Sequence, residues 1–215
     1  MLASGFIGKP AYKWWVFSAV ALGTLASVVN HGGMSVALPT IAWHFNADLT
    51  TAQWVIIAEG LAISALILPM GRLSDVLGRK RVLIAGMSLF SAGAALASVS
   101  PGIGYLIAFM ALQGLGAAML QGTAIAIVTS VFPEDERGKG IGSHGSVAGT
   151  GGVLGPAVGG FLVTAFDWRW IFYVNASLAI VAIVAAACLI RSEVLRQDSR
   201  SPKYDFTGAA LSAVV

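Results

Sequence analysis

Six long runs of apolar residues, separated by short polar gaps, limit what this chain can fold into. The runs are Trp15–Ala37, Gln53–Met70, Val82–Val99, Gly104–Val131, Ile141–Val163 and Ile171–Ile190. A transmembrane helix needs roughly 20 mostly apolar residues to cross about 30 Å of hydrocarbon, and each run is close to that length or longer. The sequence therefore predicts an all-α, polytopic membrane protein, with a bundle of six transmembrane helices within residues 1–190.

The low charge of the chain supports a lipid environment. Only 11% of the 215 residues are charged and 57% are hydrophobic, whereas soluble domains carry about 25% charged residues. A water-soluble fold of this size would leave too much apolar surface uncovered. We therefore expect the lipid bilayer to be the main partner of the chain.

The gaps between the runs carry residues that commonly end helices. These are Pro39, Gly71, Gly78, Pro101 and Pro133, and each is expected to lie at or beyond a helix end. The first run follows two lysines, as in a secretory signal peptide. It is too long for one, and five more runs follow it.

The lysines and arginines predict the orientation in the membrane. Twelve of them lie before the first run, in the second–third and fourth–fifth gaps, or after the sixth run, and only Arg169 lies on the other side. Because cytoplasmic loops are enriched in Lys and Arg, both termini are predicted to be cytoplasmic, in a multi-pass protein of the cell (inner or plasma) membrane. The net charge of +3 then reflects topology, and no nucleic acid partner is expected. Tryptophans near the ends of the runs are expected at the membrane–water interfaces; they are Trp14, Trp15, Trp54, Trp168 and Trp170.

Residues 191–215 are interpreted as a cytoplasmic linker followed by an incomplete apolar tail. The tail covers Phe206 to Val215, and ten helical residues rise only about 15 Å, half the thickness of the hydrocarbon core. Two interpretations stay open. The tail is either the beginning of a seventh span, or a frayed end or short interfacial helix.

The gap between the second and third runs carries a motif of its own. Residues 71–81 read GRLSDVLGRKR, which matches the pattern G-x-x-x-D-x-x-G-R-K/R-K/R of the major facilitator superfamily. The glycines allow a tight turn and close helix approach, and the acid suits a helix N-terminus or an arginine partner. The candidate conformational-switch residues are Gly71, Asp75, Gly78 and Arg79, with Arg137 on the next cytoplasmic loop as the expected partner of Asp75.

The fifth run carries a second motif. Residues 151–160 read GGVLGPAVGG, similar to the G-x-x-x-G-P-x-x-G-G signature of antiporters in the same superfamily. Small residues four apart let two helix backbones approach closely, and a proline can bend a helix. A hinge and a tightly packed seam are therefore expected at Gly151, Gly155, Pro156, Gly159 and Gly160.

Further segments extend the resemblance to most of the chain. Residues 113–118 read QGLGAA, the latter part of a fourth-span motif R-x-x-Q-G-x-G-A-A, and residues 132–138, 168–172 and 205–208 also resemble the fourteen-span drug:proton antiporter branch. The resemblance implies two halves of six helices around a central cavity. It also implies efflux of small lipophilic or cationic compounds driven by protons.

Two positions depart from the family pattern. The arginine of the fourth-span motif is replaced by Met110, and the aspartate of the first-span motif L-D-x-T-x-x-N-V-A-L-P is replaced by Asn30 in VNHGGMSVALP, residues 29–39. In relatives these charged positions are implicated in proton coupling. Both positions are neutral here.

An acid elsewhere is the candidate replacement. Glu59 lies in the middle of the second run, where a charged side chain costs at least about 2.5 kcal/mol, and His31 has an unperturbed pKa suited to proton exchange. We hypothesise that Glu59, assisted by His31, is the proton-coupling site, in a cavity that also includes Asn30, Met110 and Gln113. In the alternative, Glu59 is a neutral buried acid bonded to backbone and His31 is a packing residue.

The sequence favours a transporter over an enzyme. It has no phosphate-binding glycine loop followed by Lys-Ser or Lys-Thr, no nucleophile–base pair, and no histidine or cysteine pattern typical of a metal site, so neither a cofactor nor a metal is expected. Since the family pathway lies between two halves, three interpretations stay open. The chain is a half-size exporter acting as a parallel homodimer, a subunit that docks with a second half-transporter, or a truncated chain that does not transport.

Overall fold

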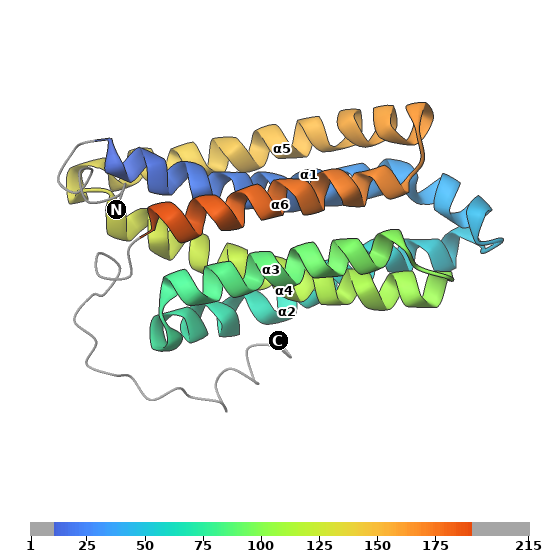
Figure 1. Ribbon diagram of the computed structural model, residues 1–215, viewed down its shortest axis with the longest axis horizontal. Coiled ribbons are helices and arrows are strands. Elements are labelled where there is room, and N and C mark those ends of the chain that lie inside the picture. Colours follow the sequence, from blue (N-terminus) through green and yellow to red (C-terminus); the bar gives the residue numbers. More distant parts are fainter. Residues whose placement is uncertain (1–10, 191–215) are drawn as a thin grey trace.

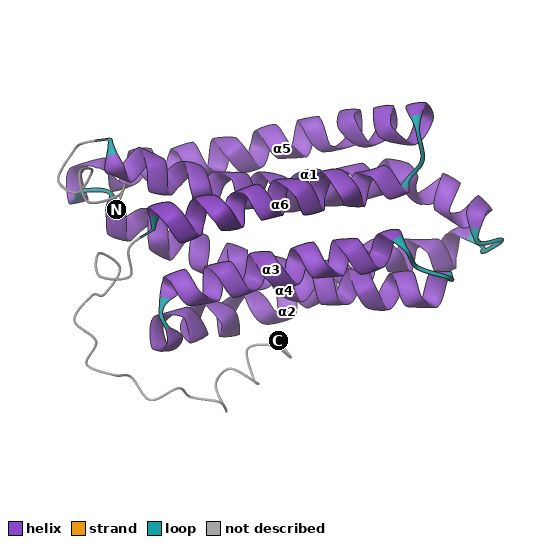
Figure 2. Cartoon of the chain, viewed as in Figure 1, coloured by secondary structure: helices purple, strands orange, loops and turns teal. Residues whose placement is uncertain are grey.

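The computed structural model describes residues 11–190, which form six long helices and one short 3-10 helix (Figures 1 and 2). The helices are α1 (Tyr12–His44), α2 (Leu49–Leu77), α3 (Arg79–Ser98), α4 (Ile103–Val131), α5 (Arg137–Ala165) and α6 (Arg169–Leu189), with η1 (Glu134–Glu136) before α5. All six long helices have the length and hydropathy needed to cross a membrane, and residues 11–190 contain no strand. The predicted all-α, six-span fold is confirmed. The predictions made for residues 191–215 lie outside the described residues.

The helices extend beyond most of the predicted run ends. The first apolar run is Trp15–Ala37, whereas α1 covers Tyr12–His44 and contains Pro39. Gly71 likewise lies inside α2, so the predicted helix ends at Pro39 and Gly71 are wrong. In lipid, continuing a helix costs less than exposing unpaired backbone groups, and transmembrane helices tolerate proline for this reason. Gly78 does end a helix: its φ of +98° separates α2 from α3, a conformation that glycine adopts without steric cost.

The six helices form two groups of three. In Figure 1, α1, α5 and α6 lie along one side of the bundle and α2, α3 and α4 along the other. The main contacts are α2 with α4, α3 with α4, α1 with α5 and α1 with α6, and α3 with α6 joins the two groups. Exchanging α1–α3 with α4–α6 reproduces this pattern. Such an inverted repeat of three helices is a common architecture of secondary transporters.

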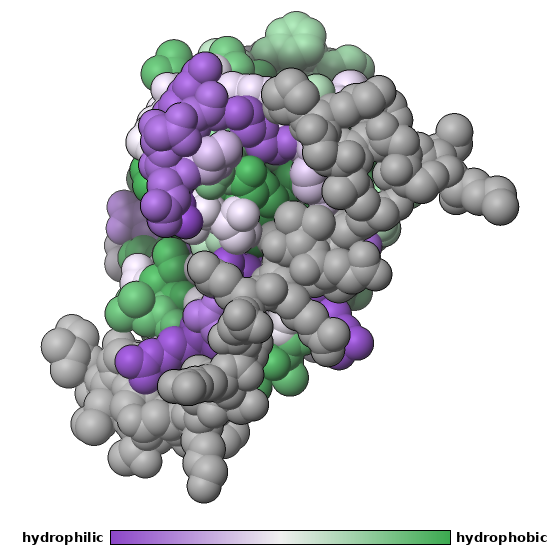
Figure 3. All heavy atoms as spheres, turned by 90° about the vertical axis from the view of Figure 1, so that its left-hand side faces the viewer, coloured by the Kyte–Doolittle hydropathy of each residue, from purple (hydrophilic) through white to green (hydrophobic). Residues whose placement is uncertain are grey.

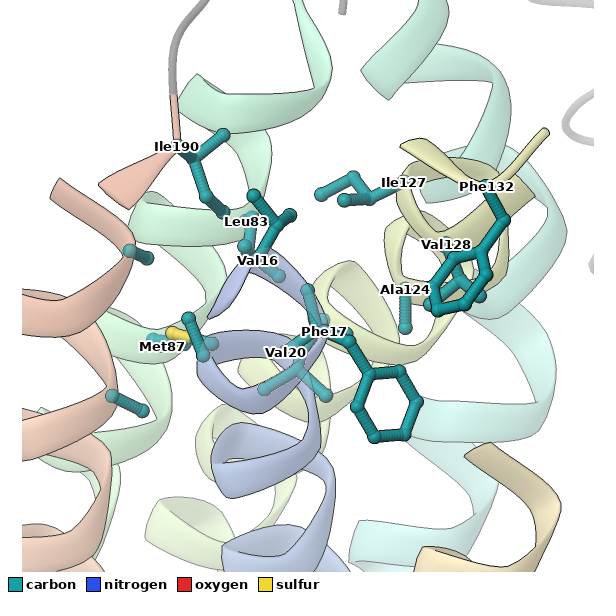
Figure 4. Close-up of a cluster of buried hydrophobic side chains, with 14 residues drawn as sticks. Val16, Phe17, Val20, Leu83, Met87, Ala124, Ile127, Val128, Phe132 and Ile190 are labelled. Carbon is teal, nitrogen blue, oxygen red and sulfur yellow. The ribbon is translucent and has the colours of Figure 1, made fainter. Parts of the chain in front are cut away.

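Apolar side chains from four helices fill the end of the bundle near the start of α1 (Figure 4). The cluster contains Val16 and Phe17 of α1 and Leu83 and Met87 of α3, and α4 and α6 complete it. These side chains are nearly or fully buried. In lipid such packing is stabilised mainly by van der Waals contact, because hydrocarbon outside the bundle is equally apolar.

One end of the bundle collects the charged residues. Seven of the eight described Lys and Arg residues lie at the end where α1 begins, called the basic end below. They connect helices there: Lys13 pairs with Glu136, Lys80 donates to the Ala187 carbonyl at 2.9 Å, and Arg79 donates to the Ala126 carbonyl at 2.8 Å. Figure 3 looks at this end and shows hydrophilic residues gathered on it.

The opposite end holds Arg169 and corrects one predicted interfacial tryptophan. Trp168 is fully buried, with its ring centroid 5.6 Å from that of His44 and 6.0 Å from that of Phe172. It lies just before α6, where the chain turns inward against the end of α1. The other four interfacial tryptophans are each at least one-third exposed.

Two helices have an uncovered face. α2 and α5 are the least buried of the six spans, and they occupy equivalent positions in the two repeats. Several glycines of these helices have open space around them, so a Cβ atom there would meet nothing within 4 Å: Gly60 of α2, and Gly138, Gly142, Gly145, Gly149 and Gly152 of α5. The spacing of three and four residues places the α5 glycines on one side of the helix.

Candidate functional site

A carboxyl group lies buried between α1 and α2. Glu59 is fully buried, in the middle of α2. Its Oε1 accepts a hydrogen bond from Asn30 Nδ2 at 3.0 Å, and its Oε2 lies 3.4 Å from His31 Nδ1. Because Asn30 and His31 are consecutive in α1, one turn of that helix supplies partners to both carboxyl oxygens.

Asn175 of α6 extends this group. It is buried, and its Nδ2 donates to Asn30 Oδ1 at 3.2 Å and to the Ile171 carbonyl at 2.8 Å. This orients the Asn30 amide, with its oxygen toward α6 and its nitrogen toward Glu59. Asn175 is a site residue that was not predicted from the sequence. The available signal was a side-chain amide within an apolar run, where unpaired polar groups are costly.

The geometry allows Glu59 to hold or release a proton. Half of the His31 side chain is exposed, whereas Glu59 has no exposed surface. With His31 protonated, Nδ1 donates to an ionised Glu59; with both groups neutral, the proton lies on the carboxyl and Nδ1 can accept it. The two states differ by a proton shift across one contact, and in neither state is the charge of Glu59 left unpaired in the membrane.

The other two predicted cavity residues lie outside this hydrogen-bonded group. Gln113 is fully buried, and neither atom of its side-chain amide has a hydrogen-bond partner among the described residues. Its neighbour Gly114 packs on the α2 backbone, where a Cβ atom would lie 2.6 Å from the Glu59 carbonyl oxygen. Met110 belongs to a buried apolar cluster. The structure therefore brings together Glu59, His31 and Asn30 and places Met110 in a packing position.

The structure pairs Asp75 with a different arginine from the one expected. Asp75 Oδ1 accepts from Arg79 Nε at 3.1 Å and Nη2 at 3.0 Å, while Arg137 pairs with Glu134 at 3.4 Å and donates to the Thr129 carbonyl. The expected Asp75–Arg137 pair is wrong. The physical reason is that α2 continues to Leu77, which places Asp75 in its last turn, four residues before Arg79. Asp75 is thus near a helix C-terminus, not at an N-terminus.

The α5 motif packs its glycines against α1. A Cβ atom on Gly159 would lie 2.4 Å from the Gly33 Cα atom, and one on Gly155 would lie 3.0 Å from the Gly32 Cα atom. Gly151 meets the Val28 side chain, whereas Gly160 has more room. Pro156 lies within α5, which continues past it to Ala165. Only glycine permits backbones to approach this closely, and the hinge stays a prediction.

Comparison with known proteins decides the family. The model of the Major Facilitator Superfamily matches residues 20–212. The chain belongs to the major facilitator superfamily. Two solved structures have a similar fold. The peptide transporter POT in complex with sulfate has a TM-score of 0.70 and 20% identity, with coverage of 86% of this chain and 39% of that one. An inward-facing bacterial homologue of the human lysosomal transporter Spinster has a TM-score of 0.73 and 17% identity, with coverage of 86% and 44%.

Major facilitator proteins of known name match the chain along almost its whole length. The riboflavin transporter RibZ of Clostridioides difficile (strain 630) is 33% identical over 201 residues, covering 94% of this chain and 44% of that protein. The puromycin resistance protein pur8 of Streptomyces alboniger is 35% identical over 205 residues, covering 95% and 40%. The multidrug resistance protein Stp of Mycobacterium tuberculosis is 32% identical over 197 residues, covering 91% and 36%. The chain thus spans less than half the length of these relatives.

Proposed function

We propose that this chain is one six-helix half of a transporter that exports lipophilic or cationic drug-like compounds in exchange for protons. The observation that carries the proposal is the buried Glu59 with its partners Asn30 and His31. An ionisable group inside a transmembrane bundle is costly, and it commonly marks a transport or proton pathway. Relatives named for resistance to puromycin and to several drugs support the choice of substrate class.

Glu59 takes the role that charged residues of the first and fourth spans have in related antiporters. Asn30 and Met110 occupy those two positions and carry no charge. A single carboxyl group can exchange a proton for a cation, because the ionised form attracts a cationic substrate and the protonated form releases it. Asn30 and Asn175 hold the carboxyl group in place, and the half-exposed His31 connects it to the outside of the bundle.

The orientation follows the basic residues. We place the basic end in the cytoplasm, because cytoplasmic loops are enriched in Lys and Arg. The Glu59 group then lies about 25 Å along α1 from Lys13, at 1.5 Å per residue. His44, at the other end of α1, lies about 20 Å from the group on the same scale, so the group is near the middle of α1, at the depth where transporters of this architecture bind their substrates.

A second six-helix bundle completes the pathway against the uncovered faces of α2 and α5. We propose a second copy of this chain, inserted in parallel, so that α2 of each copy faces α5 of the other. The open glycines of α5 suit such an interface, since small residues let helix backbones approach closely. A different half-transporter in this place would make the chain a partner subunit, and a chain with no second bundle would not transport.

Drug accumulation in cells tests the proposed function. Cells that produce the protein are loaded with a fluorescent cationic drug, and retained fluorescence is measured with and without a protonophore. The proposal expects lower retention than in control cells, restored to the control level when the proton gradient collapses. Equal retention in producing and control cells would contradict export. Lower retention that persists with the protonophore would contradict proton coupling.

Cysteine cross-linking tests the parallel homodimer. Two proteins that lack Cys188 are produced together, one with Asp75→Cys at the end of α2 and one with Gly142→Cys on the open side of α5. We expect a covalent dimer of the two chains in lipid. The matched control pairs Asp75→Cys with Val184→Cys, on an exposed position of α6, and should give little product. Strictly monomeric protein in both experiments would contradict the proposed homodimer.

A further inference from the structure

More than one and a half turns from any helix end, the six long helices carry few charged or histidine side chains. Among residues 11–190 there are three, Glu59 of α2, His31 of α1 and His144 of α5. The first two form the site described above. His144 is not part of that site, and it lies closer to the basic end, two turns after Arg137 at the start of α5.

His144 is hydrogen-bonded to the buried hydroxyl group of Thr24 in α1. Its Nε2 lies 3.1 Å from Thr24 Oγ1, and Thr24 Oγ1 also lies 3.2 Å from the Val20 carbonyl oxygen. A threonine hydroxyl has one proton to donate. When that proton points to Val20, His144 donates from Nε2, and its Nδ1 is the nitrogen that can bind a further proton.

Polar groups continue from Thr24 toward Glu59. One turn further along α1, the buried Ser27 accepts from Gln121 Nε2 of α4 at 3.3 Å. Asn30 and His31 follow after one more turn and contact Glu59. Residues three or four apart lie on one side of a helix, so these groups form a polar line along α1. Successive members are about 4.5–6 Å apart along the helix axis.

We propose that His144, Thr24 and Ser27, with Gln121, form the route by which protons pass between the basic end and Glu59. A proton binds to His144 at Nδ1 while Nε2 releases one to the Thr24 hydroxyl, so the imidazole returns to neutral. The hydroxyls of Thr24 and Ser27 each accept one proton and donate another, and bridging water spans the gaps between them. The proton arrives at Glu59, directly or through His31. This inference rests on the proposed function, and it concerns the part of the proton pathway between the cytoplasm and Glu59.

The charged groups around His144 leave it as the proton-exchanging group there. From α1, Lys13 faces this end but is paired with Glu136. From α5 itself, Arg137 is paired with Glu134, and Lys139 lies over the Trp14 ring at 5.4 Å. From η1, which packs against the start of α5, Asp135 is exposed to the outside of the bundle. The described parts of α4 and α6 that pack here bring no charged side chain or histidine. Histidine is the side chain whose unperturbed pKa allows proton exchange near neutral pH.

Infrared measurement of Glu59 tests the route without requiring transport. Protein in lipid nanodiscs is mixed rapidly with D₂O, and the shift of the protonated carboxyl band gives the rate at which Glu59 exchanges its proton. The band is assigned by its loss in Glu59→Gln. The variants are compared in a His31→Gln background, because the half-exposed His31 would otherwise give Glu59 a second path to water. In His144→Gln the amide can still donate to Thr24 but cannot carry a proton, so exchange should slow by a factor on the order of 10².

Two further variants make the result specific. Ser27→Ala removes a hydroxyl further along the line and should also slow the exchange. His44→Gln alters a histidine at the opposite end of α1, which contacts Arg169 at 3.2 Å, and should leave the rate as it is in the His31→Gln background. Unchanged rates in both His144→Gln and Ser27→Ala would overturn the route while leaving Glu59 as the proton site. Absence of the carboxyl band across the pH range would overturn the proton site and the route together.

Discussion

Glu59→Gln is expected to uncouple drug export from the proton gradient. Glutamine has nearly the same shape and can still accept from Asn30, so the helices should stay in place, but it cannot bind and release a proton. One pH unit is worth about 1.4 kcal/mol, which supports roughly a tenfold concentration ratio in one-to-one exchange. With this gradient, vesicles of the unmodified protein should reach about that ratio of internal to external drug concentration. In vesicles of the variant the ratio should fall to about one.

The matched control for this substitution is Glu134→Gln. Glu134 is an acid of η1 with a side chain that is 88% exposed, so its loss should leave the response to the gradient unchanged. The measurement is uptake of a fluorescent cationic drug into inverted vesicles over a series of imposed pH gradients. Glu59→Gln vesicles that respond to the gradient as fully as unmodified ones would remove Glu59 as the coupling group.

Gly159→Ala is expected to separate α5 from α1. A Cβ atom at this position would lie 2.4 Å from the Gly33 Cα atom and 2.8 Å from its carbonyl oxygen. These are backbone atoms, so the conflict cannot be relieved by a side-chain rotation, and one helix must move. Overpacking of this kind costs about 1–3 kcal/mol, and the free energy of unfolding should fall by an amount in that range.

Gly152→Ala, on the same helix, provides the control. Nothing lies within 4 Å of a Cβ atom at Gly152, and alanine is favoured over glycine in a helix by up to about 1 kcal/mol. In detergent the Gly152 variant should therefore be as stable as the unmodified protein, or slightly more stable. Thermal unfolding of the two variants side by side is the measurement. An equal loss of stability in both would contradict the close contact of α1 and α5.

The apolar runs were sufficient to predict six helices, but not where each helix ends. Hydropathy falls at Pro39, whereas the backbone of α1 stays helical to His44, because a helix is the cheapest way to pair backbone groups in a membrane. The same continuation of α2 to Leu77 explains the wrong partner of Asp75. A span read from hydropathy does not show how far polar residues at its ends remain helical.

The candidate site could be predicted in part. An acid in the middle of an apolar run is informative by itself, and Glu59 was found in this way, with His31 as its expected companion. Asn175 and the line from His144 to Ser27 were not found, because they depend on the rotation of each helix and on which helices are neighbours. Neither the rotation of a helix nor its neighbours can be predicted from the apolar runs of a single sequence.

Proton release on drug binding tests the central claim most directly. The claim is that the buried Glu59 exchanges a proton for the substrate. Protein in lipid nanodiscs is mixed with a cationic drug in weakly buffered solution containing a pH indicator, and released protons are compared with bound drug. We expect roughly one proton released per drug bound, as reciprocal coupling of two ligands at one group requires, and none in Glu59→Gln. Drug binding without proton release in the unmodified protein, at any pH at which it binds, would contradict the account.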